Sequence, residues 1–482
     1  MDQLPIFVTL KGQACLVVGG GEVAERKVRQ LLAAGGAVTV NSPQLTIGLQ
    51  KLQDAQRIKV VLQVFDATLI DTHLLVIAAT DERAVNHAVA AAARSALRLC
   101  NVVDDPTHSS FISPSIVDRS PLIVAISSGG RAPVLARMLR QQLERWLPSG
   151  LGELAAWAGK WRDTIKTRLP ELAARRRFWE RAFTGALSGH VLGGHMQDAD
   201  AALHSALDAA ADAGPVRGEA WLVGAGPGDP ELLSLRGFHL LQHADVVLHD
   251  RLVTPELLAF ARRDAEIIEV GKTGGGPGTS QDEINALLLA HVRAGKRVCR
   301  LKGGDPFIFG RGSEEAEMLA RAGLPFQVIP GITAANGCGA YAGIPLTHRG
   351  LAHAVTFITA HLGPDSIAAG EEIDWAALAA LRETLVIYMG GRQLAAIAEQ
   401  LITHGRGAQT PAAVVIGGTT AQQRLISGTL ADIAQRTAEA GNGSPALLYV
   451  GEVASLADRL GWFTPAGYPT RPSLELRPGD LQ

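Results

Sequence analysis

The sequence has no long hydrophobic run and no surplus of positive charge. None of its apolar stretches approaches the roughly 18 consecutive residues that a membrane-spanning helix needs. Its first ten residues lack a basic segment followed by an apolar one, so no secretion signal is predicted. The formal net charge of −2 over 482 residues disfavours a nucleic-acid-binding protein. We therefore expect a cytoplasmic protein that contacts neither a membrane nor nucleic acid.

Cysteine is scarce, with 4 residues in the chain and no C-x-x-C pair. Cys15, Cys100 and Cys299 lie in or beside apolar runs, which favours buried, reduced thiols. No Cys/His cluster has the spacing of metal ligands, and His190 and His195 lie in a Gly-rich stretch that favours a loop. We therefore expect no resident metal ion.

Hydrophobic residues make up 47% of the chain and charged residues 19%, which predicts folded domains rather than disorder. At roughly 150 residues per domain, 482 residues allow about three. We predict an α/β protein with a Gly-Pro boundary at residues 214 and 215. Its expected parts are a Rossmann-like region (1–113), a helical region (114–213), a second strand–helix region (217–462) and a loose tail (463–482).

A glycine-rich turn follows the first expected strand. The run Gly19-Gly20-Gly21-Glu22-Val23-Ala24 fits the pattern G-x-G-x-x-A, in which small residues let a dinucleotide pyrophosphate approach the backbone at a helix N-terminus. A turn used only for packing is the alternative. The second strand ends at Asn41 and not at an acidic residue, so this position does not decide between NAD and NADP.

Two further segments of the first half carry candidate chemistry. In the run 101–106, Asp104 follows a strand and is placed to accept a proton while a hydride leaves a substrate. A turn Asp that caps the next segment is the alternative, and His108 is equally ambiguous. The loop 127–133 precedes a helix and reads either as an anion-binding N-terminus or as a capping turn.

In the second half, strands repeatedly end in Gly, Asp, Lys or Pro, and ligands of open α/β sheets bind beyond such strand ends. The turn 223–230 is neither a P-loop nor a dinucleotide motif. Asp250 and Lys272 at neighbouring strand ends read as a base and a proton donor, or as a surface ion pair. The turns 303–312 and 330–335 suit a ligand with an adenine, a ribose and a sulfonium.

These strings together resemble the sirohaem synthase family of fused bacterial enzymes over nearly the whole chain. VGAGPGDP, LKGGDPFIFGRG, PGITAA and GIPLTHR are similar to uroporphyrinogen-III C-methyltransferases. GGGEVAERK, NVVDDP and FISPSIVDRSP are similar to precorrin-2 dehydrogenase/ferrochelatases. The resemblance implies a homodimer that methylates uroporphyrinogen III twice, oxidises precorrin-2 with NAD and inserts ferrous iron, which is a substrate, into sirohydrochlorin.

The resemblance also implies roles for single residues. Asp250 is the expected proton acceptor of methylation and Lys272 the donor, while Asp104 serves dehydrogenation and chelation. Ser128 matches a serine that is phosphorylated in some relatives. The expected NAD contacts are Gly19, Gly21, Glu22, Val23, Pro43 and Gln44. The expected S-adenosylmethionine contacts are Pro227, Gly303, Gly304, Asp305, Ile308, Thr333, Ala334, Met389 and Gly418. The expected tetrapyrrole contacts are Asn101, Ser128, Arg131, Arg311 and Arg349, the arginines as partners of carboxylates.

Some positions depart from the family pattern near the expected tetrapyrrole contacts. They are His249, Thr273, Pro277, Gly350 and His353. They bear on methylation rate and substrate choice more than on fold. Two other functions stay open at this point. The first half is either an enzyme or a NAD-sensing module without catalysis, and the methylase acts either on uroporphyrinogen III or on another precorrin.

Overall fold

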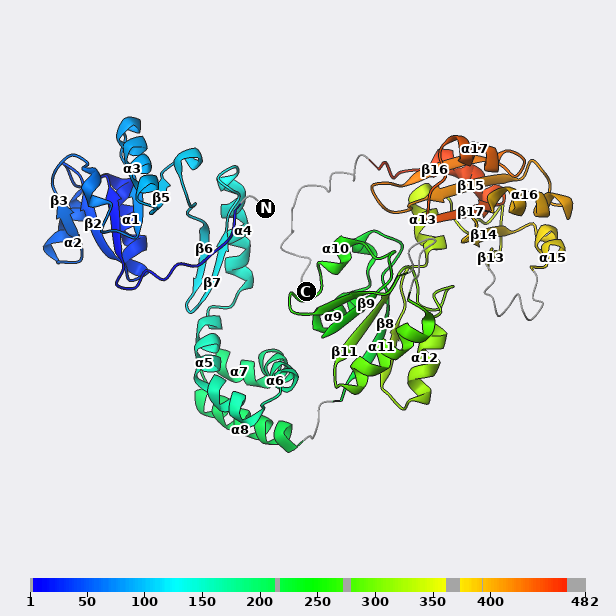
Figure 1. Cartoon of the computed structure of the whole chain (residues 1–482), viewed down its shortest axis with the longest axis horizontal. Coiled ribbons are helices and arrows are strands. Elements are labelled where there is room, and N and C mark those ends of the chain that lie inside the picture. The colour runs from blue at the N-terminus through cyan, green and yellow to red at the C-terminus, as the bar shows by residue number, and fades with distance from the viewer. Residues whose placement is uncertain (1–2, 213–216, 272–278, 361–372, 392, 466–482) are drawn as a thin grey trace. The chain divides into compact units, whose positions relative to one another are not determined.

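The computed structural model describes residues 3–212, 217–271, 279–360, 373–391 and 393–465. These form two compact units, residues 1–212 and 213–482, which we describe separately (Figure 1). The α/β class predicted from the sequence is confirmed, with a parallel Rossmann-like sheet and a helical region in the first unit and two further five-stranded sheets in the second.

The first unit begins with a parallel sheet in the order β3-β2-β1-β4-β5. Alternate residues of its apolar strands pack into two clusters with the helices, so the sheet is covered on both faces, as parallel sheets require. The carboxyl ends of β1, β4 and β5 lie at one edge, where the glycine-rich turn and the Asp104 segment both follow. The elements are β1 (Ala14–Val18), α1 (Glu22–Ala33), β2 (Ala37–Asn41), α2 (Ile47–Asp54), β3 (Lys59–Val61), β4 (Leu75–Ala78), α3 (Arg83–Ser95) and β5 (Leu99–Val102).

A β-hairpin follows, where the sequence predicted only helices. Strands β6 (Ser115–Arg119) and β7 (Leu122–Ile126) pair antiparallel, and α4 (Pro133–Trp146) packs on them. The expectation of a wholly helical region from residue 114 is therefore wrong at its start. The short apolar run of β7 has no periodicity that separates a strand from a helix, and Pro121 before it marks the turn.

Four helices complete the first unit around their own apolar core. They are α5 (Leu151–Arg168), α6 (Leu172–Thr184), α7 (Ala186–Leu192) and α8 (Met196–Asp212). Asp200 of α8 joins α5 to this core. Its carboxylate accepts hydrogen bonds from the indoles of Trp157 at 2.7 Å and Trp161 at 2.9 Å, and from Lys160 at 3.1 Å.

Replacing Asp200 with alanine is expected to destabilise the first unit by about 2–4 kcal/mol, because two indole N–H groups lose their acceptor. Burial raises the pKa of the Asp200 carboxyl, but the bonds from Trp157, Trp161 and Lys160 outweigh it and leave the pKa lowered. The stabilisation is therefore present above the unfolded pKa of about 3.9 and lost as pH falls through the lower folded value. Denaturant unfolding at pH 7 and pH 3 measures both effects. Asp208→Ala, at an exposed ion pair with Arg168, is the control and should change stability by less than about 1 kcal/mol.

The first lobe of the second unit is a parallel sheet in the order β10-β9-β11-β8-β12. Apolar residues of its strands pack against helices in two clusters. The strand–helix alternation predicted for this region is present. The elements are β8 (Glu219–Gly224), α9 (Leu235–His243), β9 (Val246–His249), α10 (Pro255–Leu258), β10 (Glu266–Glu269), α11 (Gln281–Arg293), β11 (Arg297–Lys302), α12 (Gly312–Arg321), β12 (Phe326–Ile329) and α13 (Ala334–Ala342).

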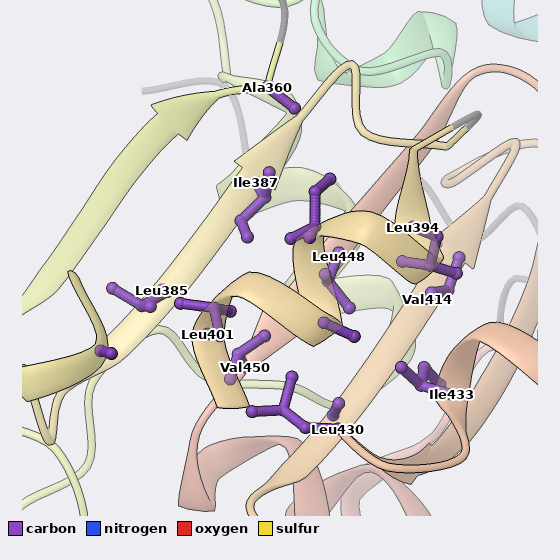
Figure 2. Packing of buried hydrophobic residues seen from close by; sticks show 14 of the residues in the cluster. Ala360, Leu385, Ile387, Leu394, Leu401, Val414, Leu430, Ile433, Leu448 and Val450 are labelled. Carbon is purple, nitrogen blue, oxygen red and sulfur yellow. The ribbon is translucent and has the colours of Figure 1, made fainter. Parts of the chain in front are cut away.

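The second lobe carries a mixed sheet in the order β13-β14-β17-β15-β16, in which only β13 and β14 pair parallel. Figure 2 shows the core on one face, where Leu385, Ile387 and Leu448 meet Leu401 of α16. Strand β16 escaped sequence analysis because its polar residues break the apolar run. The elements are β13 (Val355–Thr359), α15 (Trp375–Ala380), β14 (Thr384–Tyr388), α16 (Leu394–Thr403), β15 (Pro411–Ile416), β16 (Arg424–Thr429), α17 (Ile433–Glu439), β17 (Ala446–Val450) and α18 (Ala457–Leu460).

All four cysteines are free and buried, as expected for reduced thiols. Burial raises the pKa of Cys100 to about 11 and that of Cys299 to about 12. These thiols are therefore protonated and unreactive at neutral pH. Among the described residues, no helix combines the length and the apolar character that crossing a bilayer requires.

Candidate functional site

The turn after β1 has the backbone geometry of a dinucleotide site. A side chain at Gly19 would collide with the Ala79 carbonyl, and one at Gly20 with the Gln44 carbonyl, so both positions need glycine. Gly19 also has a left-handed φ of +127°. Gly21, by contrast, has open space where a side chain would stand, and it precedes α1 without any side-chain cap. The first amides of α1 therefore face open space, which fits a bound pyrophosphate.

The end of β2 lies beside this turn. The Asn41 side chain is buried and donates to the carbonyls of Val61 at 3.2 Å and Gln63 at 2.9 Å, while its own oxygen has no partner among the described residues. Its amide donor is thus committed to β3 and not to a ribose. Pro43 and Gln44, the predicted cofactor contacts, are exposed on the loop that follows, and the Ser42 hydroxyl donates to the Gln44 carbonyl.

Asp104 is exposed at the carboxyl end of β5 in a left-handed conformation, with φ of +58°. Such a backbone is uncommon outside glycine and occurs preferentially at functional sites. The half-buried Lys27 of α1 lies near enough to interact electrostatically with Asp104, and it donates to Ser113 at 3.0 Å. Burial and the neighbouring Arg26 lower the pKa of Lys27, and Asp104 opposes them.

The capping role considered for Asp104 belongs to its neighbour. Asp105 precedes a short 3-10 turn (Pro106–His108) and accepts from the backbone amides of Thr107 at 3.1 Å and His108 at 3.2 Å. Its other oxygen contacts the rings of His108 and of His87 in α3. No sequence signal joins His87 to this segment, because the two lie in different elements and meet only through the fold. Asp104 itself has no hydrogen bond among the described residues.

The loop before α4 approaches the Asp104 segment. Gly129 and Gly130 both have left-handed φ angles, +64° and +79°, and a side chain at Gly130 would meet the ring of Pro106. The Ser128 hydroxyl accepts from the Ala132 amide at 3.0 Å, which supports a capping turn, while the consecutive left-handed residues form a concave run of amides that suits an anion. The structure therefore accommodates both interpretations of this loop. Arg131 beside it is exposed.

In the second unit, three strand ends meet backbone to backbone. Gly226 and Gly304 form a β-bridge, and a side chain on Gly331 would collide with the backbone of Gly304 and Gly224. Packing therefore requires glycine at Gly224 and Gly331, whereas Gly226 and Gly304 have left-handed φ angles of +79° and +69° that favour it. A side chain built on Gly304 would point toward the amide of Ala334, so the predicted contacts in the turns 303–305 and 333–334 are adjacent.

Hydrogen bonds across the two lobes fix the walls of this region. The Tyr388 hydroxyl of β14 shares a hydrogen bond with Thr333 at 2.6 Å and accepts from the Ala335 amide at 2.9 Å. Asp229 accepts from Tyr341 at 2.6 Å, and its amide donates to Thr419 at 3.0 Å. The remaining predicted cofactor contacts gather at the same junction: Pro227 against Gly337, Gly418 against Gly228 and Cys338, Met389 next to Tyr388, and Ile308 against the core of the second lobe.

Asp305 is a positioning residue. Its carboxylate accepts from the amides of Phe307 at 2.8 Å and Gly331 at 3.0 Å, so it holds the turn 303–310 against the end of β12. The chain's two glycine-rich regions therefore both present backbone groups to open space, and the residues fit a methyl donor with an adenosyl group as well as a dinucleotide.

Asp250 is the exposed end of a buried ion network, and not a member of a surface ion pair. Its carboxylate accepts from Arg300 at 2.6 Å, and Arg300 and Lys302 each donate to Glu315 at 3.0 Å. The Asp250 side chain is 28% exposed, whereas Arg300 and Lys302 are 2% exposed and Glu315 is fully buried. The sequence showed a trace of this network, because Arg300 and Lys302 stand at alternate positions of an apolar strand.

The network holds two carboxylates and two cations, so its formal charges cancel. Burial opposes the charge on Arg300, but Asp250 and Glu315 outweigh it and raise the pKa of Arg300. Burial and the charge of Arg300 lower the pKa of Lys302, against the attraction of Glu315. Arg300 therefore holds a fixed positive charge behind Asp250.

Several predicted residues stand elsewhere or are already engaged. Lys272, Thr273 and Pro277 lie outside the described residues. The buried Asn101 donates to the Phe111 carbonyl at 3.0 Å. Arg311 forms an exposed ion pair with Glu314 at 2.7 Å. Arg349, Gly350 and His353 are exposed on the loop after α13, and His249 is buried at the end of β9.

Four known families match successive parts of the chain. They are described as "Putative NAD(P)-binding" (residues 6–115), "Sirohaem biosynthesis protein central" (119–145), "Sirohaem synthase dimerisation region" (150–207) and "Tetrapyrrole (Corrin/Porphyrin) Methylases" (220–434).

Whole proteins match over almost their full length. A siroheme synthase of Photorhabdus laumondii is 51% identical over 96% of both chains. One of Tolumonas auensis is 52% identical over 96% of this chain and 97% of that one. Among solved structures, a uroporphyrin-III C-methyl transferase of Thermus thermophilus, complexed with S-adenyl homocysteine, is 41% identical and covers 49% of this chain and 99% of that one, with a TM-score of 0.43.

Proposed function

The chain belongs to the sirohaem synthase family, and from that membership we propose how its two units divide three reactions. The protein is a multifunctional enzyme that methylates uroporphyrinogen III, dehydrogenates precorrin-2 and inserts ferrous iron to give sirohaem. The observation that carries this conclusion is identity of about half over almost the whole of single curated chains. The interpretation of the first half as a binding module without catalysis is thereby set aside.

Dehydrogenation and chelation belong to the first unit in this proposal. NAD, as the hydride acceptor, supplies the oxidising chemistry when bound. The open amides after Gly21 hold its pyrophosphate, and Glu22, Val23, Pro43 and Gln44 line its path. Asp104 accepts the proton that leaves the substrate carbon, and in chelation it accepts, one after the other, the two pyrrole protons that iron replaces, passing each to water. The support for Asp104 is its exposed, left-handed position at the strand edge.

Methylation belongs to the second unit. S-adenosylmethionine supplies an electrophilic methyl group when bound. The turns 303–305 and 333–334, with Pro227, Ile308, Met389 and Gly418, hold the donor against the backbone and exclude water. Asp250, with Lys272 as its expected partner, handles the proton of the tetrapyrrole carbon that accepts the methyl group. Arg300 keeps Asp250 oriented.

Asp250→Asn is expected to lower kcat of uroporphyrinogen III methylation about 10²-fold, because an amide does not accept the proton. The KM for S-adenosylmethionine should stay near its original value, because Asp250 does not line the donor. Steady-state methylation at varied donor concentration gives both constants. Glu256→Gln, an exposed carboxylate on the neighbouring α10, is the matched control. Equal kcat for Asp250→Asn and the control would remove Asp250 from the reaction.

We infer a homodimer from the match of residues 150–207 to the family's dimerisation region, and we propose that the hairpin β6–β7, which precedes that match, also contacts the partner. A two-stranded sheet is marginal alone, and Ile116, Leu122 and Ile123 are each about 40% exposed on it. Ile123→Asp is expected to shift the protein from dimer to monomer in sedimentation velocity, because a charge would be buried at the contact. Ile47→Asp, at an exposed isoleucine of α2, should remain dimeric. A dimeric Ile123→Asp protein would place the contact elsewhere.

The whole proposal is tested by supplying uroporphyrinogen III, S-adenosylmethionine, NAD and ferrous iron and then omitting each in turn. We expect uroporphyrinogen III to remain when the methyl donor is left out, precorrin-2 to accumulate without NAD, and sirohydrochlorin to accumulate without iron, each identified by its absorbance spectrum. No methylated product in the complete mixture would contradict the assignment of the second unit. NADP in place of NAD tests the choice that Asn41 leaves open.

A further inference from the structure

Two histidines and an aspartate come together beside the candidate chelation residue. His87 lies on α3, and Asp105 and His108 lie in the turn after β5. Asp105 Oδ2 is 3.2 Å from His87 Nε2 and 2.7 Å from His108 Nδ1. All three potential ligand atoms lie within 4.8 Å of one another, and they are the one such group of His, Cys, Asp or Glu among the described residues.

The spacing of these atoms fits a metal ion. At metal–ligand bonds of about 2.1 Å, neighbouring ligands of an octahedral or tetrahedral ion are roughly 3.0–3.4 Å apart. The two imidazole–carboxylate distances lie at or just below this range. The rings of His87 and His108 stack with centroids 4.0 Å apart, and His87 Nε2 and His108 Nδ1 both contact Asp105 Oδ2. Small ring rotations would therefore open a common ligand position.

We propose that His87, Asp105 and His108 bind a divalent transition-metal ion, and that this is where ferrous iron docks before its insertion into the macrocycle. Two imidazoles and one carboxylate suit ferrous iron, whereas calcium and magnesium prefer all-oxygen sites. The delivery role rests on the proposed chelatase function; the metal site itself does not.

Charge and exposure support a site that loads and releases its ion. The site offers one carboxylate and two imidazoles as ligands. The side chains of His87, His108 and Asp105 are 46%, 38% and 28% exposed. Three protein ligands leave further coordination positions open, which lets a tetrapyrrole nitrogen replace water. Asp104, the candidate proton acceptor, is the adjacent residue.

Cobalt(II) is the probe for the site, because its visible absorption reports imidazole and carboxylate ligands. The full-length untagged protein is titrated with cobalt(II), alone and as the variants His87→Gln, His108→Gln and Asp105→Asn. Asparagine can still accept hydrogen bonds from the backbone amides of the turn, so Asp105→Asn removes the negative charge and keeps the cap. We expect one bound ion and at least about a tenfold higher Kd in each variant, since even residues outside the ligand shell cost 10–100-fold. The control variant His190→Gln/His195→Gln removes two imidazoles elsewhere in the first unit and should leave the Kd unchanged.

Iron insertion into sirohydrochlorin tests the delivery role. His87→Gln should raise the KM for ferrous iron about tenfold, while kcat recovers at saturating iron. The metal site would be overturned if the wild-type protein bound no cobalt. It would also be overturned if the variants bound cobalt as tightly as the wild type while unfolding at the same temperature. An unchanged KM in a variant that has lost cobalt binding would overturn delivery. Absence of sirohaem with the wild-type protein at saturating iron would instead contradict the chelatase function, and the cobalt titration would still decide the site.

Discussion

Asp104→Asn is expected to lower kcat for NAD-dependent oxidation of precorrin-2 by 10²–10⁴-fold, the range for loss of a positioned proton acceptor. Iron insertion should fall similarly, because the same carboxylate is assigned to the pyrrole protons. Asparagine is the sharp substitution here. It tolerates the left-handed backbone that Asp104 adopts, so lost activity reflects lost proton acceptance and not strain.

Absorbance kinetics on precorrin-2 and on sirohydrochlorin measure the two steps separately. Asp54→Asn, at an exposed carboxylate of α2, is the matched control and should behave as wild type. Methylation of uroporphyrinogen III, which belongs to the other unit, reports the amount of enzyme, and thermal unfolding shows whether the unit that carries Asp104 is folded. An Asp104→Asn protein with normal rates in both later steps would transfer the proton acceptor to another group.

Glu315→Gln is expected to destabilise the second unit by about 3–5 kcal/mol, the cost of breaking a buried ion pair from one side. Glu315 is fully buried and accepts from both Arg300 and Lys302, so the amide would leave two buried cations with Asp250 alone. Glu317→Gln is the matched control on the same helix. Glu317 forms an ion pair with Arg321, and the two side chains are 65% and 79% exposed. Losing this pair should lower the free energy of unfolding by less than about 1 kcal/mol.

The cost of Glu315→Gln should also depend on pH. The pKa of Lys302 is already lowered in the folded protein, and removing Glu315 takes away an attraction that opposes this. The folded state then binds fewer protons than the unfolded state, so stability rises with pH. Unfolding free energies measured from pH 7 toward the ordinary lysine pKa of about 10.4 should show the gap between variant and wild type narrowing. A constant gap would indicate that Lys302 stays charged.

What the sequence made predictable was local. The glycine-rich turn after β1 and the strand-end turns of the methylase are runs of neighbouring residues, and each appears where the pattern put it. The β6–β7 hairpin and β16 were missed, because short apolar or polar runs carry no periodicity that separates strand from helix. The sequence also did not reveal that the second lobe's sheet is mixed, because the alternation of strands and helices does not determine the direction of each strand.

The contacts between charged groups could not be predicted from the sequence, because they form only in the folded chain. Asp250 was recognised, but its partner Arg300 is 50 residues away in sequence and joins it only because β9 and β11 pair in register. His87 and Asp105 are separated by 18 residues and by a strand. Such contacts are set by tertiary packing, which no spacing rule covers.

The hydroxyl of Tyr388 has a consequence for how the methylase responds to its surroundings. Burial raises the pKa of Tyr388 above its ordinary value of about 10, against the hydrogen bonds from Thr333 and Ala335. The phenol therefore keeps its proton throughout the physiological range and continues to hold the start of α13 against β14. Cellular acidification or mild alkalinity would therefore leave the attachment of α13 to β14 unchanged, beside the turn 333–334 that is proposed to hold the methyl donor.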